Sequence, residues 1–174
     1  MKKILFVLIT FFSITDIQAQ VVEKIEDNIM ISATTGKEVI GNSAEVFTGY
    51  IDYTFSEFTS NWSSLKTEPT GCSIYRVNKK GANYIEIFGS ISLDLNDCKL
   101  TQDQIICFCE ENYEYLKGFN PIKKGYTIFL FEAKSCYQVA TVYKKEEELL
   151  IFCDNISLNL PLTGEIRVIV PKIY

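Results

Sequence analysis

The cysteines are the residues of this chain whose side chains are the first candidates for chemistry, because the sequence contains six cysteines and no histidine. Two of them, Cys107 and Cys109, lie one residue apart in the stretch 105-IICFCEENYEYLKG-118. A zinc site or a thioredoxin-like redox centre would be expected to use CxxC-type spacing, which does not occur here. A catalytic thiol at Cys107 would need a lowered pKa, which the nearby glutamates oppose, and a histidine base. Metal binding and thiol catalysis are therefore disfavoured.

Disulfide bonding is the chemistry that remains for these thiols, provided that the protein is exported. An even number of cysteines in an exported chain is typical of a disulfide framework, but the sequence alone does not select the pairing. The residues predicted to form disulfides are Cys72, Cys98, Cys107, Cys109, Cys136 and Cys153.

Other catalytic patterns are weak or missing. Without histidine, Ser-His-Asp and Cys-His catalysis and His-ligated metals are excluded, and no phosphate-binding glycine motif occurs. Glu86, Asp94 and Glu132 lie on expected strands, but no spacing links them as a glycosidase pair, and solvated strand-face charges are the simpler interpretation. One SxxK match, from Ser63 to Lys66, lacks the companion motifs of Ser-Lys enzymes. We therefore expect no catalytic residue, no cofactor and no metal.

Alternation of apolar and polar residues predicts that most of the chain forms strands. In 83-NYIEIFGSISLDL-95, Ile85, Ile87 and Ile91 share one face of a predicted strand, and 45-EVFTGYIDYTF-55 follows the same pattern. A charged hairpin turn is expected at 144–148. Further strands rich in β-branched and aromatic residues are predicted at 29–33, 73–77, 126–132, 137–143, 149–153 and 165–170.

Aromatic residues on the open face of these strands define a candidate interaction surface. Tyr50, Tyr84 and Phe88 fall on the faces opposite the apolar rows. Aromatic side chains on an open sheet face can bind a protein or a glycan. The alternative is that the helix or a second sheet covers this face.

A helix is predicted over about residues 102–117. Thr101 and Gln104 form a capping box, and Gly118 can end the helix. On a helical wheel Cys109 lies on the apolar face and Cys107 lies among glutamates on the solvent face, so the two thiols point apart. The preferred pairing joins Cys98 to Cys107 and joins Cys109 to a strand cysteine such as Cys136 or Cys153. A weaker helical turn is expected at 57–65.

These elements together predict an α+β, β-rich fold. Its core would be a mainly antiparallel sheet, either curved or doubled into a sandwich, with one amphipathic helix at about 102–117 and stabilisation by disulfides. An all-β sandwich with an incidental helix is the alternative.

The N-terminus has the pattern of a secretory signal peptide, predicted at residues 1–19. Lys2 and Lys3 precede the apolar segment 4–14, and cleavage is expected between Ala19 and Gln20. Residues 20–174 would then form a single globular domain that is secreted or periplasmic. The apolar segment is too short to span a bilayer, so no integral membrane segment is expected after cleavage.

Charge and composition favour an exported, non-catalytic binding protein, similar in role to an inhibitor or an immunity protein. The net charge of −5 disfavours nucleic acid, which leaves another protein or a cell-envelope component as the expected partner. The alternatives are a structural or adhesive surface component and a His-free, carboxylate-dependent hydrolase of envelope polysaccharide. Two sequons, Asn61-Trp62-Ser63 and Asn155-Ile156-Ser157, matter only if the source glycosylates them.

Overall fold

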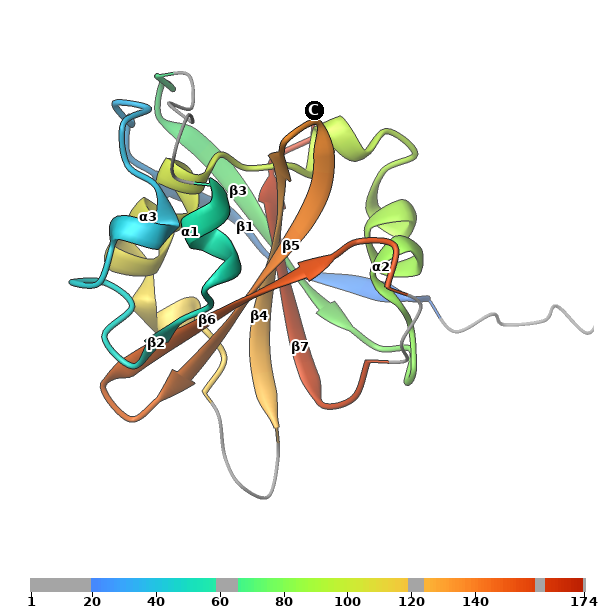
Figure 1. Cartoon of the computed structure of the whole chain (residues 1–174). Helices are drawn as coiled ribbons and strands as arrows, with labels where there is room; N and C mark the ends of the chain where they lie inside the picture. The colour runs from blue at the N-terminus through green and yellow to red at the C-terminus, as the bar shows by residue number, and fades with distance from the viewer. Residues whose placement is uncertain (1–19, 59–65, 119–123, 159–161, 174) are drawn as a thin grey trace, which may run out of the picture.

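A strongly twisted sheet runs through the computed structural model, which describes residues 20–58, 66–118, 124–158 and 162–173 (Figure 1). Within these residues the sheet has seven strands in the order β1-β3-β7-β4-β5-β6-β2. Four of the strand pairs are antiparallel, whereas β4–β7 and β2–β6 are parallel. The strands are β1 (Val22–Ile31), β2 (Tyr50–Ile51), β3 (Thr70–Val77), β4 (Gly125–Ala133), β5 (Cys136–Lys145), β6 (Glu148–Asn155) and β7 (Glu165–Pro171).

The β-rich class is thus confirmed. The sheet is mixed, with two parallel pairs beside the four antiparallel ones, and it is one sheet rather than a sandwich. All six shorter predicted strands find a counterpart, although β1 starts well before residue 29. Strand β4 lies at the centre of the sheet because its side chains from Tyr126 to Phe131 are apolar or small enough to be buried on both faces. The 144–148 segment forms the expected tight hairpin, with Lys145 opposite Glu148.

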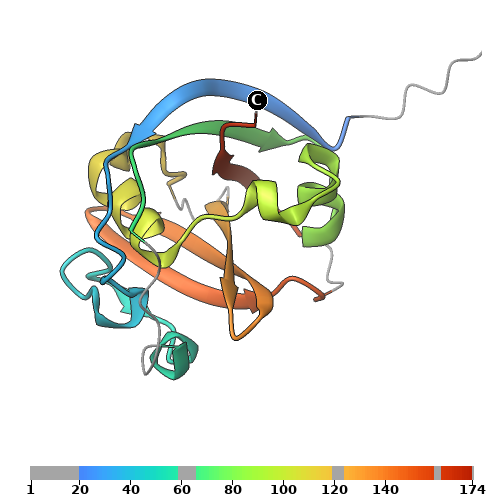
Figure 2. The same cartoon turned by 90° about the horizontal axis from the view of Figure 1, so that it is seen from above.

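Two apolar clusters fill the two sides of the twisted sheet, and a helix covers each side (Figure 2). Helix α3 (Gln102–Glu111) packs on the first cluster, where Phe108 meets Phe129 of β4 with ring centroids 5.5 Å apart. Helix α2 (Tyr84–Ile91) packs on the second cluster, which contains Ile128 and Leu130 of β4. Alternate residues of the central strand therefore serve opposite cores.

Helix α2 corrects the prediction of a strand at 83–95. Asn83 accepts a hydrogen bond from the backbone N–H of Glu86 at 2.9 Å, and the Glu86 carboxylate accepts one from the Asn83 backbone N–H at 3.1 Å. This capping box starts a helix that buries Tyr84, Ile87 and Phe88, which have helical spacing. Ile85, expected on the buried face of a strand, is exposed.

The 45–55 segment is also not a strand over most of its length. Only Tyr50 and Ile51 pair with β6, and helix α1 (Thr54–Phe58) follows. Phe47 and Phe55 are buried as expected, but Tyr53 is 74% exposed although the alternation placed it on the same face. Most of the predicted turn at 57–65, together with Ser63 of the SxxK match, lies outside the described residues.

Helix α3 confirms the predicted start at the Thr101–Gln104 capping box but ends earlier than residue 117. Asn112 leaves the helical conformation, and its side-chain amide donates to the carbonyl oxygen of Met30 at 3.0 Å. This bond fixes the end of α3 to β1.

Three short 3-10 helices complete the described secondary structure: η1 (Ile40–Asn42), η2 (Leu95–Cys98) and η3 (Tyr113–Tyr115). In the described ranges, no helix is long and apolar enough to cross a bilayer.

Replacing Gly164 with alanine is expected to lower the free energy of unfolding by about 1–3 kcal/mol. Gly164 has a φ of 114°, and an added Cβ would collide with the carbonyl oxygen of Lys124. Urea denaturation of the two proteins measures the effect. Gly89→Ala is the control: it lies in α2 with open space around its Cβ position, and there alanine should be neutral or stabilising. Equal effects of both changes would contradict the strain at Gly164.

Candidate functional site

One row of apolar side chains crosses the sheet on the face that α2 covers. Val22 lies opposite Val77, Ile166 lies opposite Tyr126, and Leu150 lies opposite both Tyr143 and Tyr50. Extending the ladders by one residue past the Arg76–Arg167 and Thr127–Val142 pairs completes the row. In sheet order it consists of Val22, Val77, Ile166, Tyr126, Tyr143, Leu150 and Tyr50.

The α2 side of this row is buried and the β2 side is not. Val22, Ile166 and Tyr126 belong to the cluster under α2, whereas Tyr143 and Leu150 are half-buried and Tyr50 is 43% exposed. Figure 1 shows why, because α2 and β2 lie at opposite ends of the sheet. The strands β5, β6 and β2 thus carry apolar side chains beyond the reach of the helix.

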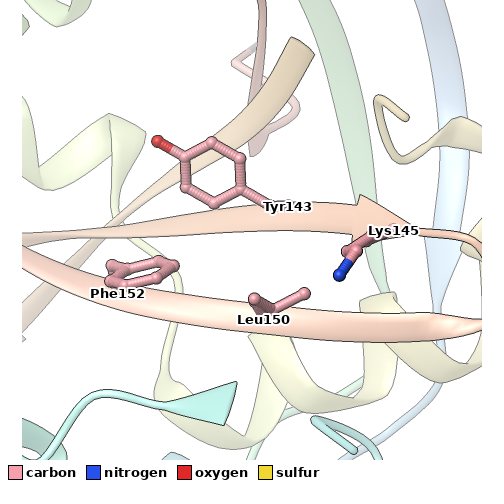
Figure 3. A pocket seen from close by; sticks show the side chains of 4 residues that line it. All are labelled: Tyr143, Lys145, Leu150 and Phe152. Carbon is pink, nitrogen blue, oxygen red and sulfur yellow. The ribbon is translucent and has the colours of Figure 1, made fainter. Parts of the chain in front are cut away.

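A hollow of about 240 Å³ lies over this uncovered part of the sheet and is lined by Tyr143, Lys145, Leu150 and Phe152 (Figure 3). The Tyr50 ring lies beside it, with its centroid 5.1 Å from that of Phe152. We call these five residues the aromatic groove. They come from β2, β5 and β6, so the sheet itself fixes their positions.

Ring contacts hold the aromatic side chains in place. The Tyr143 ring lies edge-on to Phe152 at 5.4 Å between centroids and contacts Tyr126 at 5.3 Å. Such pairs contribute about 0.5–1.5 kcal/mol each beyond simple burial. The groove is therefore formed before any ligand arrives.

A hydrogen-bonded polar group lies under the inner end of the groove. The Tyr84 hydroxyl donates to the Asp154 carboxylate at 2.6 Å and lies 3.4 Å from the Thr141 hydroxyl. Burial, and then the bond to Asp154, raise the pKa of Tyr84 well above its usual range. Burial likewise raises the pKa values of Tyr126 and Tyr143. At neutral pH these hydroxyls stay protonated, so they act as hydrogen-bond donors.

Of the three residues predicted as an interaction surface, the structure places only Tyr50 at an exposed site. Tyr84 is 4% exposed and Phe88 is fully buried, because both point from α2 into the core. The groove residues Tyr143 and Phe152 were not predicted as surface residues. Their strands were predicted correctly, but alternation alone does not say which face of a central strand a helix leaves open.

All six cysteines are free thiols in the structure, so the disulfide-stabilised part of the fold prediction gains no support. Cys98 lies in the cluster under α2 and Cys107 packs against the cluster under α3, on opposite faces of the sheet. This arrangement does not favour the Cys98–Cys107 pairing. Cys109 is buried as predicted, and it shares its cluster with Cys72 and Cys153 rather than with Cys136. Disulfide formation itself stays a prediction.

The surroundings of Cys107 disfavour a reactive thiol, as predicted. Burial, and then the hydrogen bond and charge of Glu111, raise the pKa of Cys107 to about 11. The thiolate is therefore scarce at neutral pH.

Alkylation of the reduced protein at pH 8 is expected to modify Cys136 about 100-fold faster than Cys109. Cys136 is exposed at the start of β5, whereas Cys109 is buried in α3. Iodoacetamide labelling followed by peptide mass spectrometry measures both rates. In urea the two rates should converge, and convergence without urea would show that α3 does not protect its thiol.

The three carboxylates considered for a hydrolase each have a separate structural partner. Glu86 pairs with Lys79 at 2.8 Å, which lowers the pKa of Glu86, and Glu132 pairs with Lys99 at 2.6 Å. Asp94 accepts from the Asn96 backbone N–H at 2.9 Å at the start of η2. In the part of the chain that the structure describes, no three His, Cys, Asp or Glu side chains are grouped to hold a metal ion.

The fold and the groove define a β-rich protein with a mixed sheet, two helix-covered cores and a preformed aromatic hollow. Comparison with protein-family models, with curated proteins and with solved structures finds no match for this chain.

Proposed function

We propose that this protein is an exported, non-catalytic binding protein that holds a partner protein through the aromatic groove. The observation that carries the proposal is the apolar surface on β5, β6 and β2, left open on the face that α2 buries elsewhere. Clustered exposed aromatic residues are enriched at protein interfaces.

The size of the groove favours an anchor side chain from a partner protein. Small-molecule pockets commonly enclose about 300–1,000 Å³ and bury most of the ligand. The hollow of about 240 Å³ is smaller and open. A large apolar side chain inserted between Tyr143, Phe152 and Leu150 would be desolvated there, as interface hot spots are. Lys145 at the rim favours an acidic residue next to that anchor.

The N-terminal pattern at 1–19 supports export, and an inhibitor or an immunity-type protein is the role that best fits a small acidic chain of this kind. A structural or adhesive component would instead associate with itself. Size-exclusion chromatography separates these roles, because the proposed binding protein is expected to elute as a monomer in the absence of its partner.

The double variant Tyr50→Ala/Phe152→Ala is expected to weaken partner binding by about 100-fold, since each aromatic hot spot contributes about 1–2 kcal/mol or more. The partner is first identified by placing a photo-crosslinking amino acid at position 50 in the producing cells. The partner identified in this way is then purified by itself. Titration measures the Kd of its complex with the wild-type protein and with the variant.

Tyr53→Ala is the matched control, because Tyr53 is an exposed aromatic residue three positions away that does not line the groove. It should leave the Kd within about two-fold of wild type. A role for the groove would be contradicted if the groove variant and Tyr53→Ala lost affinity equally, or if both bound the partner as tightly as wild type. If a polysaccharide binds the groove and no protein does, the ligand is a glycan and not a protein.

A further inference from the structure

Basic side chains gather at the end of the sheet where β3 finishes and where β4 and β7 begin. Two adjoining hollows lie there, of about 790 and 260 Å³, and they share Val77, Gly164, Glu165 and Ile166. The basic residues that line them, together called the basic cleft, are Arg76, Lys79, Lys80, Lys117, Lys124 and Arg167. These include both arginines of a chain whose net charge is −5, and Glu165 is the only acidic residue among the described lining residues.

The two arginines of the basic cleft are direct cross-strand neighbours, Arg76 on β3 and Arg167 on β7. Like charges in this position destabilise a sheet. Arg76 is neutralised by Glu23 at 2.6 Å, but Arg167 donates to the backbone carbonyl oxygen of Tyr115, which carries no net charge. Among the described residues, the half-buried Arg167 therefore has no acidic partner.

The lysines divide into paired and unpaired ones. Lys79 pairs with Glu86 at 2.8 Å and Lys117 pairs with Glu165 at 2.5 Å. Within the described ranges, Lys80 and Lys124 have no acidic partner. Two lysines and Arg167 thus leave an excess of positive charge around the hollows.

Backbone hydrogen bonds fix the walls of the cleft. The N–H of Gly81 donates to the carbonyl oxygen of Leu162 at 3.2 Å, and the N–H of Leu162 donates back to that of Ala82 at 3.1 Å. The N–H of Glu165 donates to the carbonyl oxygen of Lys124 at 2.8 Å. Three segments that are distant in the sequence are therefore held together, and the cations do not need to be assembled by a ligand.

We propose that the basic cleft binds a small polyanion, meaning a molecule with at least two carboxylate or phosphate groups. An anion in the larger hollow would relieve the mutual repulsion of Lys80 and Lys124. Arg167 lines the adjoining smaller hollow, where its planar guanidinium can bind a second carboxylate or phosphate group through two hydrogen bonds. The volume of the larger hollow suits a small molecule. A long nucleic acid would meet the acidic remainder of the surface. The cleft shares no lining residue with the aromatic groove, so this site is independent of the proposed function.

Isothermal titration of the mature chain with pyrophosphate and with citrate at low salt tests the proposal. Binding is expected, it should weaken as salt is added, and Lys80→Gln/Lys124→Gln should weaken it about ten-fold. The comparison of the two probes shows whether phosphate or carboxylate is preferred.

Lys37→Gln/Lys66→Gln removes the same charge from two exposed lysines outside the cleft and should change the affinity less than about two-fold. Unchanged melting temperatures show that both double variants fold. The proposal is overturned if neither pyrophosphate nor citrate binds at about 1 mM. It is also overturned if the cleft variant and the control variant weaken anion binding equally.

Discussion

Raising the pH of the reduced protein from 7 to 10 is expected to lower its free energy of unfolding by at least about 4 kcal/mol. Three thiols that the fold buries completely account for about 4 kcal/mol of this loss, namely those of Cys72, Cys98 and Cys109. The partly buried thiols of Cys107 and Cys153, whose pKa values burial also raises, add a smaller amount. Burial raises the pKa of Cys72 to about 12 and, with a smaller contribution from Asp97, that of Cys98 to about 11. Burial also raises the pKa of Cys109.

The direction follows from the protons that each state binds. A thiol of the unfolded chain ionises near its ordinary pKa of 9.0, whereas the buried thiol of the folded chain stays protonated. The stabilisation is therefore complete below about pH 9 and declines as the pH rises toward the folded-state values. At one pH unit above 9 each fully buried thiol loses about 1.4 kcal/mol, which for three thiols gives the expected minimum. The buried Tyr84 and Tyr126 add to the loss above about pH 10.

Urea unfolding at pH 7, 8, 9 and 10 with a phosphine reductant measures this dependence. Cys136→Ser should leave the change between pH 7 and 10 intact, because Cys136 is exposed. Cys72→Ala should reduce the change by about 1.4 kcal/mol, whatever its effect on stability at pH 7. A free energy of unfolding that stays constant to within about 1 kcal/mol would contradict buried free thiols. Oxidised protein with disulfides should show such constancy, since a disulfide has no proton to lose.

The parts of the fold that the sequence predicts are those with strong local signals. Strand β4 is apolar on both faces and lies at the centre of the sheet. Thr101 and Gln104 start α3 by a capping box that the residue types alone identify. These features depend on neighbours within a few residues, which is why they can be recognised without the fold.

Helix α2 shows where periodicity is ambiguous. In 83–95 the apolar residues fit a strand through Ile85, Ile87 and Ile91, but Tyr84, Ile87, Phe88 and Ile91 also fit one face of a helix. The capping box formed by Asn83 and Glu86 resolves the ambiguity, because it satisfies backbone donors that only a helix start leaves free. The same signature that predicted α3 was therefore present before α2.

The candidate site depends on tertiary structure and could be predicted only in part. Tyr50 was identified as exposed, but its position beside Phe152 requires the parallel pairing of β2 with β6, two segments about a hundred residues apart. Whether Tyr143 is covered depends on how far α2 extends along the sheet. No local pattern contains this information, since long-range pairing and the reach of a helix are set by the packing of the whole chain.

Replacing Phe129 with alanine is expected to lower the free energy of unfolding by about 3–5 kcal/mol. Phe129 is fully buried on the central strand and packs against Phe108 of α3, so its removal leaves a cavity between the sheet and the helix. Leu93→Ala is the control, because the Leu93 side chain is 101% exposed, and there the change should stay within about 0.5 kcal/mol.

The same comparison also tests the contact between the two rings. Phe108→Ala should cost a similar amount, and the double variant should be less destabilised than the sum of the single variants by about 0.5–1.5 kcal/mol, because the pair can be lost only once. Strict additivity would show that the two side chains do not meet. A small effect of Phe129→Ala on the free energy of unfolding would contradict the place of Phe129 in the core. Shortening an aromatic side chain that is exposed or loosely packed costs little stability, whereas shortening a buried one leaves a cavity.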